Sequence, residues 1–107
     1  MDNINGRINQ QANCTLEAVT YAISNIGTQA NKTFLFRIKE LVALIEEGNY
    51  SNFLELKGII ANNIPESPSS GNNIFMMDVQ GCGLGLPLQT FLDELMIMVE
   101  DSVGQEN

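Results

Sequence analysis

The chain has no histidine and no tryptophan, and its five lysines and arginines stand against thirteen aspartates and glutamates, a formal net charge of −8. Without histidine, catalysis by a serine or cysteine paired with a histidine base is excluded. Neither Cys14 nor Cys82 has a basic residue close in sequence to activate its thiol. A sugar-cleaving pair of carboxylates would need a cleft walled by rigid aromatics, and the aromatic residues number only seven. We therefore expect that the protein is not an enzyme.

Metal and nucleotide sites are equally poorly supported. Zinc sites use short clusters of cysteine and histidine, whereas Cys14 and Cys82 are far apart, and no D-x-D-x-D-G calcium loop is present. The glycine-rich segment 81–85 reads G-x-G-x-G, which is not the dinucleotide fingerprint, and no lysine follows it as in a P-loop. We expect no metal and no cofactor, and we interpret 81–85 as a tight connection. Two cysteines are too few for a disulfide framework, and one bridge between them stays open.

The chain also lacks the features of membrane and nucleic-acid-binding proteins. No apolar run approaches the ~20 residues that span a bilayer, and the polar N-terminus does not resemble a signal peptide. Basic residues are scattered and end at Lys57, so the second half contains seven carboxylates and nothing to neutralise them. Neither a membrane surface nor a phosphate backbone is an expected partner of such a chain. We expect a soluble, cytoplasmic protein.

What the chain does contain is enough for one globular core. Its length of 107 residues is near the commonest domain size, and 44% of the residues are hydrophobic against 17% charged. We expect a single helical domain spanning residues 1–107. The clearest loop is 65–73, which is rich in proline, serine, glycine and asparagine.

Apolar residues at three- and four-residue steps predict two long helices in the first half. The first is expected from Thr15, as the N-cap, to Ile26, because Gly6 and the Asn-Cys-Thr stretch at 13–15 weaken the segment before it. The second is expected to begin after an N-cap at Thr33 and to end at Gly48.

The second half predicts two more helices with an extended segment between them. Asn52 and Glu55 are spaced as a capping box for a short helix that ends before Pro65. Residues 74–79 are expected to form a short strand or a buried extended segment, which would need a partner from elsewhere. The last helix is expected from Pro87 to Val103. The predicted fold is mostly α: a compact bundle of three to four helices with one short extended or β segment before the last helix.

The last helix has two distinct faces. At ~100° per residue, Leu88, Phe91, Leu92, Leu95, Val99 and Val103 form an apolar stripe. Asp93, Glu94, Glu100 and Asp101 form two carboxylate rows on the other side, and Ile97 projects between the rows. An apolar anchor inside a charged rim is typical of a protein interface, but a single exposed isoleucine is also common on monomers. Met76, Met77, Met96 and Met98 are expected mostly in the core, and Phe36 is either packed or exposed.

These observations favour a small acidic domain that binds a basic protein. The most concrete candidate is an inhibitor or immunity protein that covers the cationic surface of a nuclease-type toxin. Its partner-binding residues are expected to be Asp93, Glu94, Ile97, Glu100 and Asp101, with Glu40, Glu46 and Glu47 secondary. The alternative is a helical adaptor, secretion chaperone or regulatory subunit, either monomeric or homodimeric, that acts through Leu35, Phe36 and the 74–79 segment. The sequence leaves the oligomeric state open.

Overall fold

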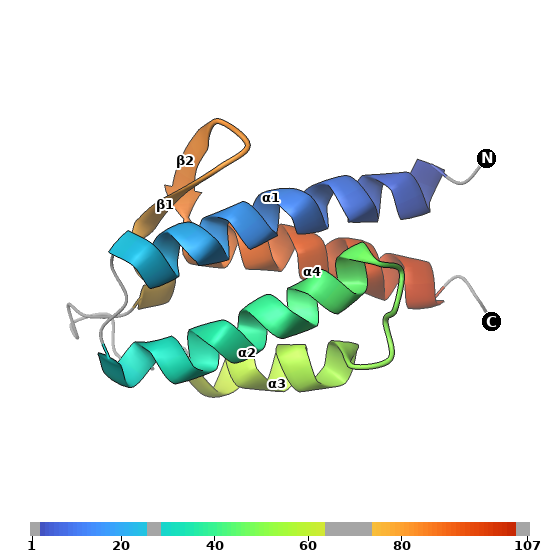
Figure 1. The fold of residues 1–107 in the computed structure, drawn as a ribbon. Coiled ribbons are helices and arrows are strands. Elements are labelled where there is room, and N and C mark those ends of the chain that lie inside the picture. The colour runs from blue at the N-terminus through green and yellow to red at the C-terminus, as the bar shows by residue number, and fades with distance from the viewer. Residues whose placement is uncertain (1–2, 26–28, 64–73, 105–107) are drawn as a thin grey trace.

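The computed structural model describes residues 3–25, 29–63 and 74–104. Within these residues the fold consists of four α-helices, with a short turn of 3-10 helix and an antiparallel hairpin before the last of them (Figure 1). The predicted mostly helical bundle with an extended segment before its final helix is therefore confirmed. In chain order the elements are α1 (Asn3–Asn25), α2 (Gln29–Glu46), α3 (Phe53–Asn63), η1 (Ile74–Met76), β1 (Asp78–Gly81), β2 (Leu84–Pro87) and α4 (Leu88–Gly104).

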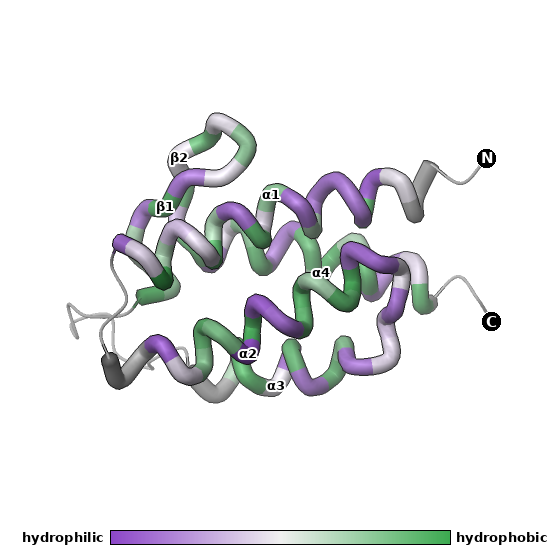
Figure 2. Tube along the Cα trace, in the orientation of Figure 1, coloured by the Kyte–Doolittle hydropathy of each residue, from purple (hydrophilic) through white to green (hydrophobic). Residues whose placement is uncertain are grey.

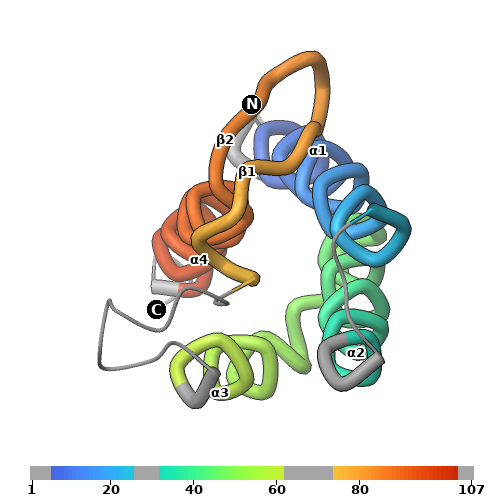
Figure 3. The backbone as a smooth tube through the Cα atoms, turned by 90° about the vertical axis from the view of Figure 1, so that its left-hand side faces the viewer, coloured from blue at the N-terminus to red at the C-terminus, as the bar shows by residue number. Residues whose placement is uncertain are grey.

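The helices surround one hydrophobic core in the order α4, α1, α2, α3 (Figure 3). Close packing joins α1 to both α2 and α4, and α2 to α3, whereas α3 does not pack closely on α4. Hydrophobic and hydrophilic residues alternate along each helix (Figure 2), so that every helix turns an apolar side inward. The largest side chains with essentially no exposure include Phe75, Ile8, Leu35, Ile38, Leu41, Leu56, Leu88, Leu92 and Leu95. Each such burial contributes about 1.5–3 kcal/mol.

Helix α1 begins twelve residues before the expected N-cap, at Asn3 rather than Thr15. Thr15 instead lies inside the helix, fully buried, and its hydroxyl donates a hydrogen bond to the backbone carbonyl of Phe91 on α4 at 3.2 Å. Ile8 and Ala12, also fully buried, extend the apolar face through the weak first half. Packing of this face outweighs the low helix propensity of Gly6 and Asn13. Ile26 and Gly27, the predicted end, lie outside the described residues.

Helix α2 ends as predicted. Gly48 has a φ of 93°, and its N–H donates to the carbonyl of Ile45 at 2.9 Å. The N–H of Asn49 donates to the carbonyl of Leu44 at 2.9 Å, which completes a Schellman motif. The start of the helix is earlier than expected, at Gln29, so that Thr33 is an exposed helical residue and not the N-cap.

Helix α3 ends before Pro65, as predicted, but the expected capping box is not formed. Both carboxylate oxygens of Glu55 accept hydrogen bonds from Arg37 on α2, at 2.6 and 2.7 Å, instead of turning back to Asn52. This bidentate contact fastens α3 to α2. The predicted loop 65–73 lies outside the described residues.

The extended segment finds its partner in the residues that follow it. β1 pairs with β2, with Asp78 opposite Pro87 and Gly81 opposite Leu84. The two residues between the strands, Cys82 and Gly83, have φ values of 53° and 80°. Positive φ at both positions is the requirement of the tight type I′ hairpin turn. The glycine-rich segment is thus a connection, as expected, and α4 follows it from Leu88.

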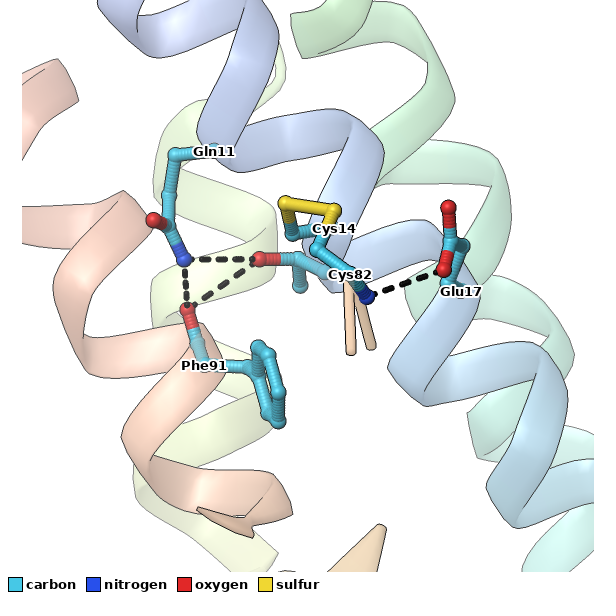
Figure 4. The surroundings of a disulfide bond; sticks show 6 residues. Gln11, Cys14, Glu17, Cys82 and Phe91 are labelled. Carbon is cyan, nitrogen blue, oxygen red and sulfur yellow. Dashed lines mark hydrogen bonds between the residues drawn. A yellow bond between two sulfur atoms is a disulfide. The ribbon is translucent and has the colours of Figure 1, made fainter. Parts of the chain in front are cut away.

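A disulfide ties this hairpin to α1. Cys14 and Cys82 are bonded, with Cα atoms 5.2 Å apart (Figure 4). The backbone N–H of Cys82 also donates to the carboxylate of Glu17 on α1 at 2.9 Å. Gly81 lies so close to α1 that an added Cβ would stand 2.5 Å from the carbonyl oxygen of Cys14. The bridge that the sequence left open therefore sits where the hairpin already packs on α1.

Candidate protein-binding site

The outer side of α4 carries the side chains that the sequence assigns to a partner. Ile97 keeps 54% of its surface exposed, although Met96 beside it is buried. The four carboxylates that flank it, Asp93, Glu94, Glu100 and Asp101, are exposed as well. The helix that carries them has no lysine or arginine. All five side chains therefore face solvent, as the helical spacing indicates, and their role in binding stays a prediction.

Two hollows between α3 and α4 extend this surface. The first has a volume of about 330 Å³ and is lined by Lys57, Ile60, Ala61, Asp93, Met96, Ile97 and Glu100. The second has a volume of about 470 Å³ and is lined by Tyr50, Ser51, Phe53, Leu54, Lys57, Glu100 and Val103. Because Lys57 and Glu100 line both, the hollows adjoin, and we call them together the α3–α4 groove. The groove lies between α3 and α4, which do not pack closely on each other.

The floor of the groove is apolar, and so is part of its margin. Ile60 and Met96 in the first hollow and Phe53 in the second are each less than a tenth exposed. Leu54 and Val103 at the second hollow are 75% and 45% exposed. The prediction that Val103 belongs to the core stripe of α4 is therefore wrong, because α3 does not pack closely enough on α4 to cover it.

One ion pair crosses the groove. Nζ of Lys57 and Oε2 of Glu100 are 2.5 Å apart. The sequence interpretation that nothing neutralises the acids of the second half is thus wrong for Glu100, because α3 brings the last basic residue of the chain to it. Among the described residues, Asp93, Glu94 and Asp101 form no ion pair.

The carboxyl group of Asp93 has a perturbed pKa. Partial burial raises its pKa above the ordinary value of 3.8, and the neighbouring charge of Glu94 acts in the same direction. A hydrogen bond with the side chain of Gln89 acts in the opposite direction. The negative charge of Asp93 is therefore less well solvated than that of a fully exposed aspartate.

The secondary candidates lie on a different part of the molecule. Glu40 and Glu46 belong to α2 and Glu47 to the turn after it, and none of the three lines the groove. Figure 3 shows α2 and α4 on opposite sides of the core. Glu40 also shares Arg37 with Glu55: hydrogen bonds to Glu55, and secondarily to Glu40, raise the pKa of Arg37, and the hydrogen bond from Arg37 lowers the pKa of Glu55. The structure therefore does not join these acids to the α4 face.

The residues proposed for the alternative, apolar mode of binding lie partly in the core and partly on the surface. Leu35 is fully buried and so is unable to contact a partner. Phe36 is 50% exposed, which settles the position that the sequence left open. Met76 and Met77 are 60% and 41% exposed, so their expected place in the core is wrong. They lie at the end of η1 and the start of the hairpin, where Phe75 and Val79 turn inward instead.

Sequence reasoning missed the α3 wall of the groove. Leu54 lies about 100° around the helix from Phe53, off the stripe that faces the core. A short helix with apolar residues on more than one side was the available signal. The sequence contained no such signal for Ala61, because a small residue at an exposed helix position needs no partner.

The described part of the chain contains no candidate metal cluster and no candidate membrane span. No three cysteine, aspartate or glutamate side chains in it are placed to hold a metal ion. None of its helices combines the length and the apolar character that crossing a bilayer requires.

Comparisons with known proteins add no assignment to this geometry. No family model matches the chain, no curated protein matches it, and no solved structure matches it.

Proposed function

We propose that this protein binds a basic protein through the acidic outer face of α4, and that it is an inhibitor or immunity protein for a nuclease-type toxin. The observation that carries the proposal is Ile97, exposed between two rows of carboxylates, three of which form no ion pair within the described residues. An apolar anchor inside a charged rim combines affinity with a fast, oriented encounter.

The charges of α4 work against its own stability. Four carboxylates share one face, and like charges on a surface repel. Asp101 also lies in the last turn of α4, where the helix dipole disfavours negative charge by about 0.3–1 kcal/mol. A cationic partner relieves both effects. The electrostatic free energy that destabilises the unbound protein therefore favours binding.

A nuclease is the partner that suits this chemistry best. An enzyme that cleaves nucleic acid needs lysine and arginine to hold phosphates. A small protein with a net charge of −8 competes for those same residues. Occupying the cationic surface then blocks the substrate directly.

A helical adaptor or regulatory subunit is the second candidate, and the exposure of Phe36, Met76 and Met77 favours it. If the protein has this function, we expect a homodimer that dissociates when those side chains are truncated. Light scattering over a range of concentrations separates the two functions. A monomer supports the inhibitor, and a stable dimer lost in Phe36→Ser supports the adaptor.

The disulfide bears on the compartment. The sequence predicts a cytoplasmic protein, yet disulfides form mainly in oxidising compartments and are rare in the cytosol. The Cys14–Cys82 bond therefore weighs toward an exported protein, and with it toward inhibition outside the cytoplasm. Alkylation of freshly lysed cells, followed by mass spectrometry, tests this: two alkylated thiols support the cytoplasm, and an unalkylated bridge supports export.

The proposed function is tested by capture and inhibition. The immobilised protein and its D93N/E94Q/E100Q/D101N variant are exposed to extracts of the source cells. We expect a basic protein that the wild type retains and the variant loses, and whose nuclease activity falls when an equal amount of the free domain is added. The matched control is E40Q/E46Q/E47Q/D78N, which removes four charges elsewhere. Equal loss in the control, or no inhibition of the retained protein, contradicts the proposal.

A further inference from the structure

The two walls of the α3–α4 groove are antiparallel helices. Ala61 and Asp93 line the hollow at one end of the groove, Lys57 meets Glu100 in the middle, and Leu54 and Val103 line the hollow at the other end. On each wall the lining residues recur at three- and four-residue steps. From Asp93 to Val103 the α4 wall is about 15 Å long, at 1.5 Å per residue, which is nearly three turns of helix.

Between their first and last turns, these walls offer a partner only side chains. In the middle of a helix the backbone N–H and C=O groups bond within the helix itself. An extended segment laid in the groove would gain no ladder of backbone hydrogen bonds, unlike one added to a sheet edge. A helix satisfies its own backbone and fills such a groove with side chains spaced at i, i+3, i+4 and i+7.

The residues that line the groove determine which kinds of side chain that helix carries on each of its sides. Ile60, Met96 and Phe53 form an apolar floor in both hollows, and Ile97 and Leu54 are the exposed apolar side chains of the margin. Asp93 and Glu100 line the groove, and Glu94 and Asp101 continue the negative charge beyond it. Lys57 is the one cation among the lining residues, and it is already paired.

We propose that the α3–α4 groove is the docking site for one amphipathic helix of the partner, apolar along one side and rich in lysine or arginine along its margins. This inference rests on the proposed function and specifies which element of the basic protein is held. The helix places one apolar side chain in each hollow, on either side of the Lys57–Glu100 pair. Its cationic margin lies against Asp93, Glu94 and Asp101.

A second copy of this chain does not fit the groove as well. Each copy has a net charge of −8, and its α4 would set carboxylates against carboxylates. Charge complementarity therefore selects a basic helix over self-association.

A synthetic peptide pair tests the groove without knowledge of the natural partner. The first peptide is a fluorescein-labelled sequence of about 18 residues, long enough to cover the walls at 1.5 Å per residue. It has leucines at i, i+3, i+4 and i+7 and lysines elsewhere. The second has the same composition, with the leucines distributed around the helix. Fluorescence anisotropy measures the dissociation constant of each with the whole protein. We expect the amphipathic peptide to bind at least about tenfold more tightly, a difference of ~1.4 kcal/mol.

Variants of the protein locate the binding. Ala61→Leu fills the first hollow without changing charge and should weaken the amphipathic peptide about tenfold. Gln10→Leu adds the same side chain on an exposed position of α1 and should leave binding unchanged. Ile97→Ser, at an exposed position that the fold does not require, should weaken binding even if Ala61→Leu impairs folding. Circular dichroism checks that each variant is folded.

The outcomes separate this inference from the proposed function. If both peptides bind equally and D93N/E94Q/E100Q/D101N weakens both, the acidic face stands and the helix groove is overturned. If Ala61→Leu and Ile97→Ser bind like the wild type, the groove is overturned as well. If neutralising the four carboxylates changes neither peptide's affinity, the acidic face itself is contradicted.

Discussion

Lys57 on α3 and Glu100 on α4 form an ion pair that lies between the two hollows of the α3–α4 groove. Both side chains are about half exposed, at 55% and 46%. Exposed pairs of this kind contribute about 0–1 kcal/mol to stability. The pair therefore matters less for holding α3 to α4 than for what the groove presents to a cation.

Removing Lys57 should strengthen binding of a basic helix. Lys57→Met keeps the aliphatic stem, deletes the one cation that lines the groove and frees Glu100 for the partner. We expect the affinity for the amphipathic lysine peptide to increase several-fold at low salt, with a change in unfolding free energy of no more than about 1 kcal/mol. The control is Lys39→Met, which makes the same charge change on α2, outside the groove. Equal effects of the two variants, measured by anisotropy, would contradict a role for the groove.

Two glycines of the hairpin should respond very differently to the same substitution. A Cβ on Gly81 would meet the carbonyl oxygen of Cys14 at 2.5 Å and the ring of Phe91 at 3.0 Å. A Cβ on Gly85 would meet only the flexible side chain of Gln80. We expect Gly81→Ala to lower the unfolding free energy by about 1–3 kcal/mol, measured by urea denaturation. Gly85→Ala should cost clearly less. Equal costs would show that the hairpin does not pack on α1 as described.

Loss of the disulfide should destabilise the whole domain. The bonded cysteines are 68 residues apart in sequence, so the bridge restricts a large loop of the unfolded chain. The chain-entropy relation gives about 4 kcal/mol for such a loop, and measured values are commonly ~2–4 kcal/mol. We expect the unfolding free energy of the C14S/C82S variant to be lower by an amount in this range. Denaturation of the variant and of the oxidised wild type under the same conditions measures the difference. A variant as stable as the oxidised wild type would show that the bond does not form in solution.

Stability should depend on pH through Asp93. Because burial raises the pKa of this carboxyl in the folded state above 3.8, the folded protein holds the proton more tightly than the unfolded chain. The contribution of Asp93 to stability is therefore complete below pH 3.8 and is lost as the pH rises through the folded-state pKa. Asp93→Asn, which resembles the protonated form, should be more stable than the wild type at pH 7 and should lose that advantage in acid.

Thermal unfolding across this pH range measures the effect. Asp101→Asn is the matched control, since it makes the same charge change on the same helix at a position that does not line the groove. If the two variants shift the unfolding temperature equally at every pH, burial of Asp93 is not the cause.

Periodicity and caps predicted the elements whose sequence and packing agree. Gly48 ends α2 because the chain there requires a positive φ, and the spacing of apolar residues on α4 places Ile97 away from the core. The first half of α1 was not predictable in the same way. Gly6, Asn13 and Thr15 each disfavour a helix locally, and the burial of the apolar face that Ile8 and Ala12 form outweighs that preference.

The features that bear on the site depend on how the helices come together. That Lys57 reaches Glu100 follows from the placement of α3 beside α4, which no local pattern encodes. The pairing of Cys14 with Cys82 likewise requires the hairpin to fold back on α1. Met76 and Met77 are exposed because Ile74 and Phe75 occupy the core-facing positions of this short segment. The acidic face was therefore predictable, whereas the groove beside it was not.

The association rate constant of this protein with its captured basic partner, measured by stopped-flow mixing over a series of salt concentrations, tests the central claim most directly. If α4 steers the encounter, D93N/E94Q/E100Q/D101N will associate at least about tenfold more slowly at low salt and will show a flatter salt dependence. The control E40Q/E46Q/E47Q/D78N, which has the same net charge, will stay close to the wild type. A control that slows as much as the α4 variant, or an α4 variant as fast as the wild type, would contradict the account.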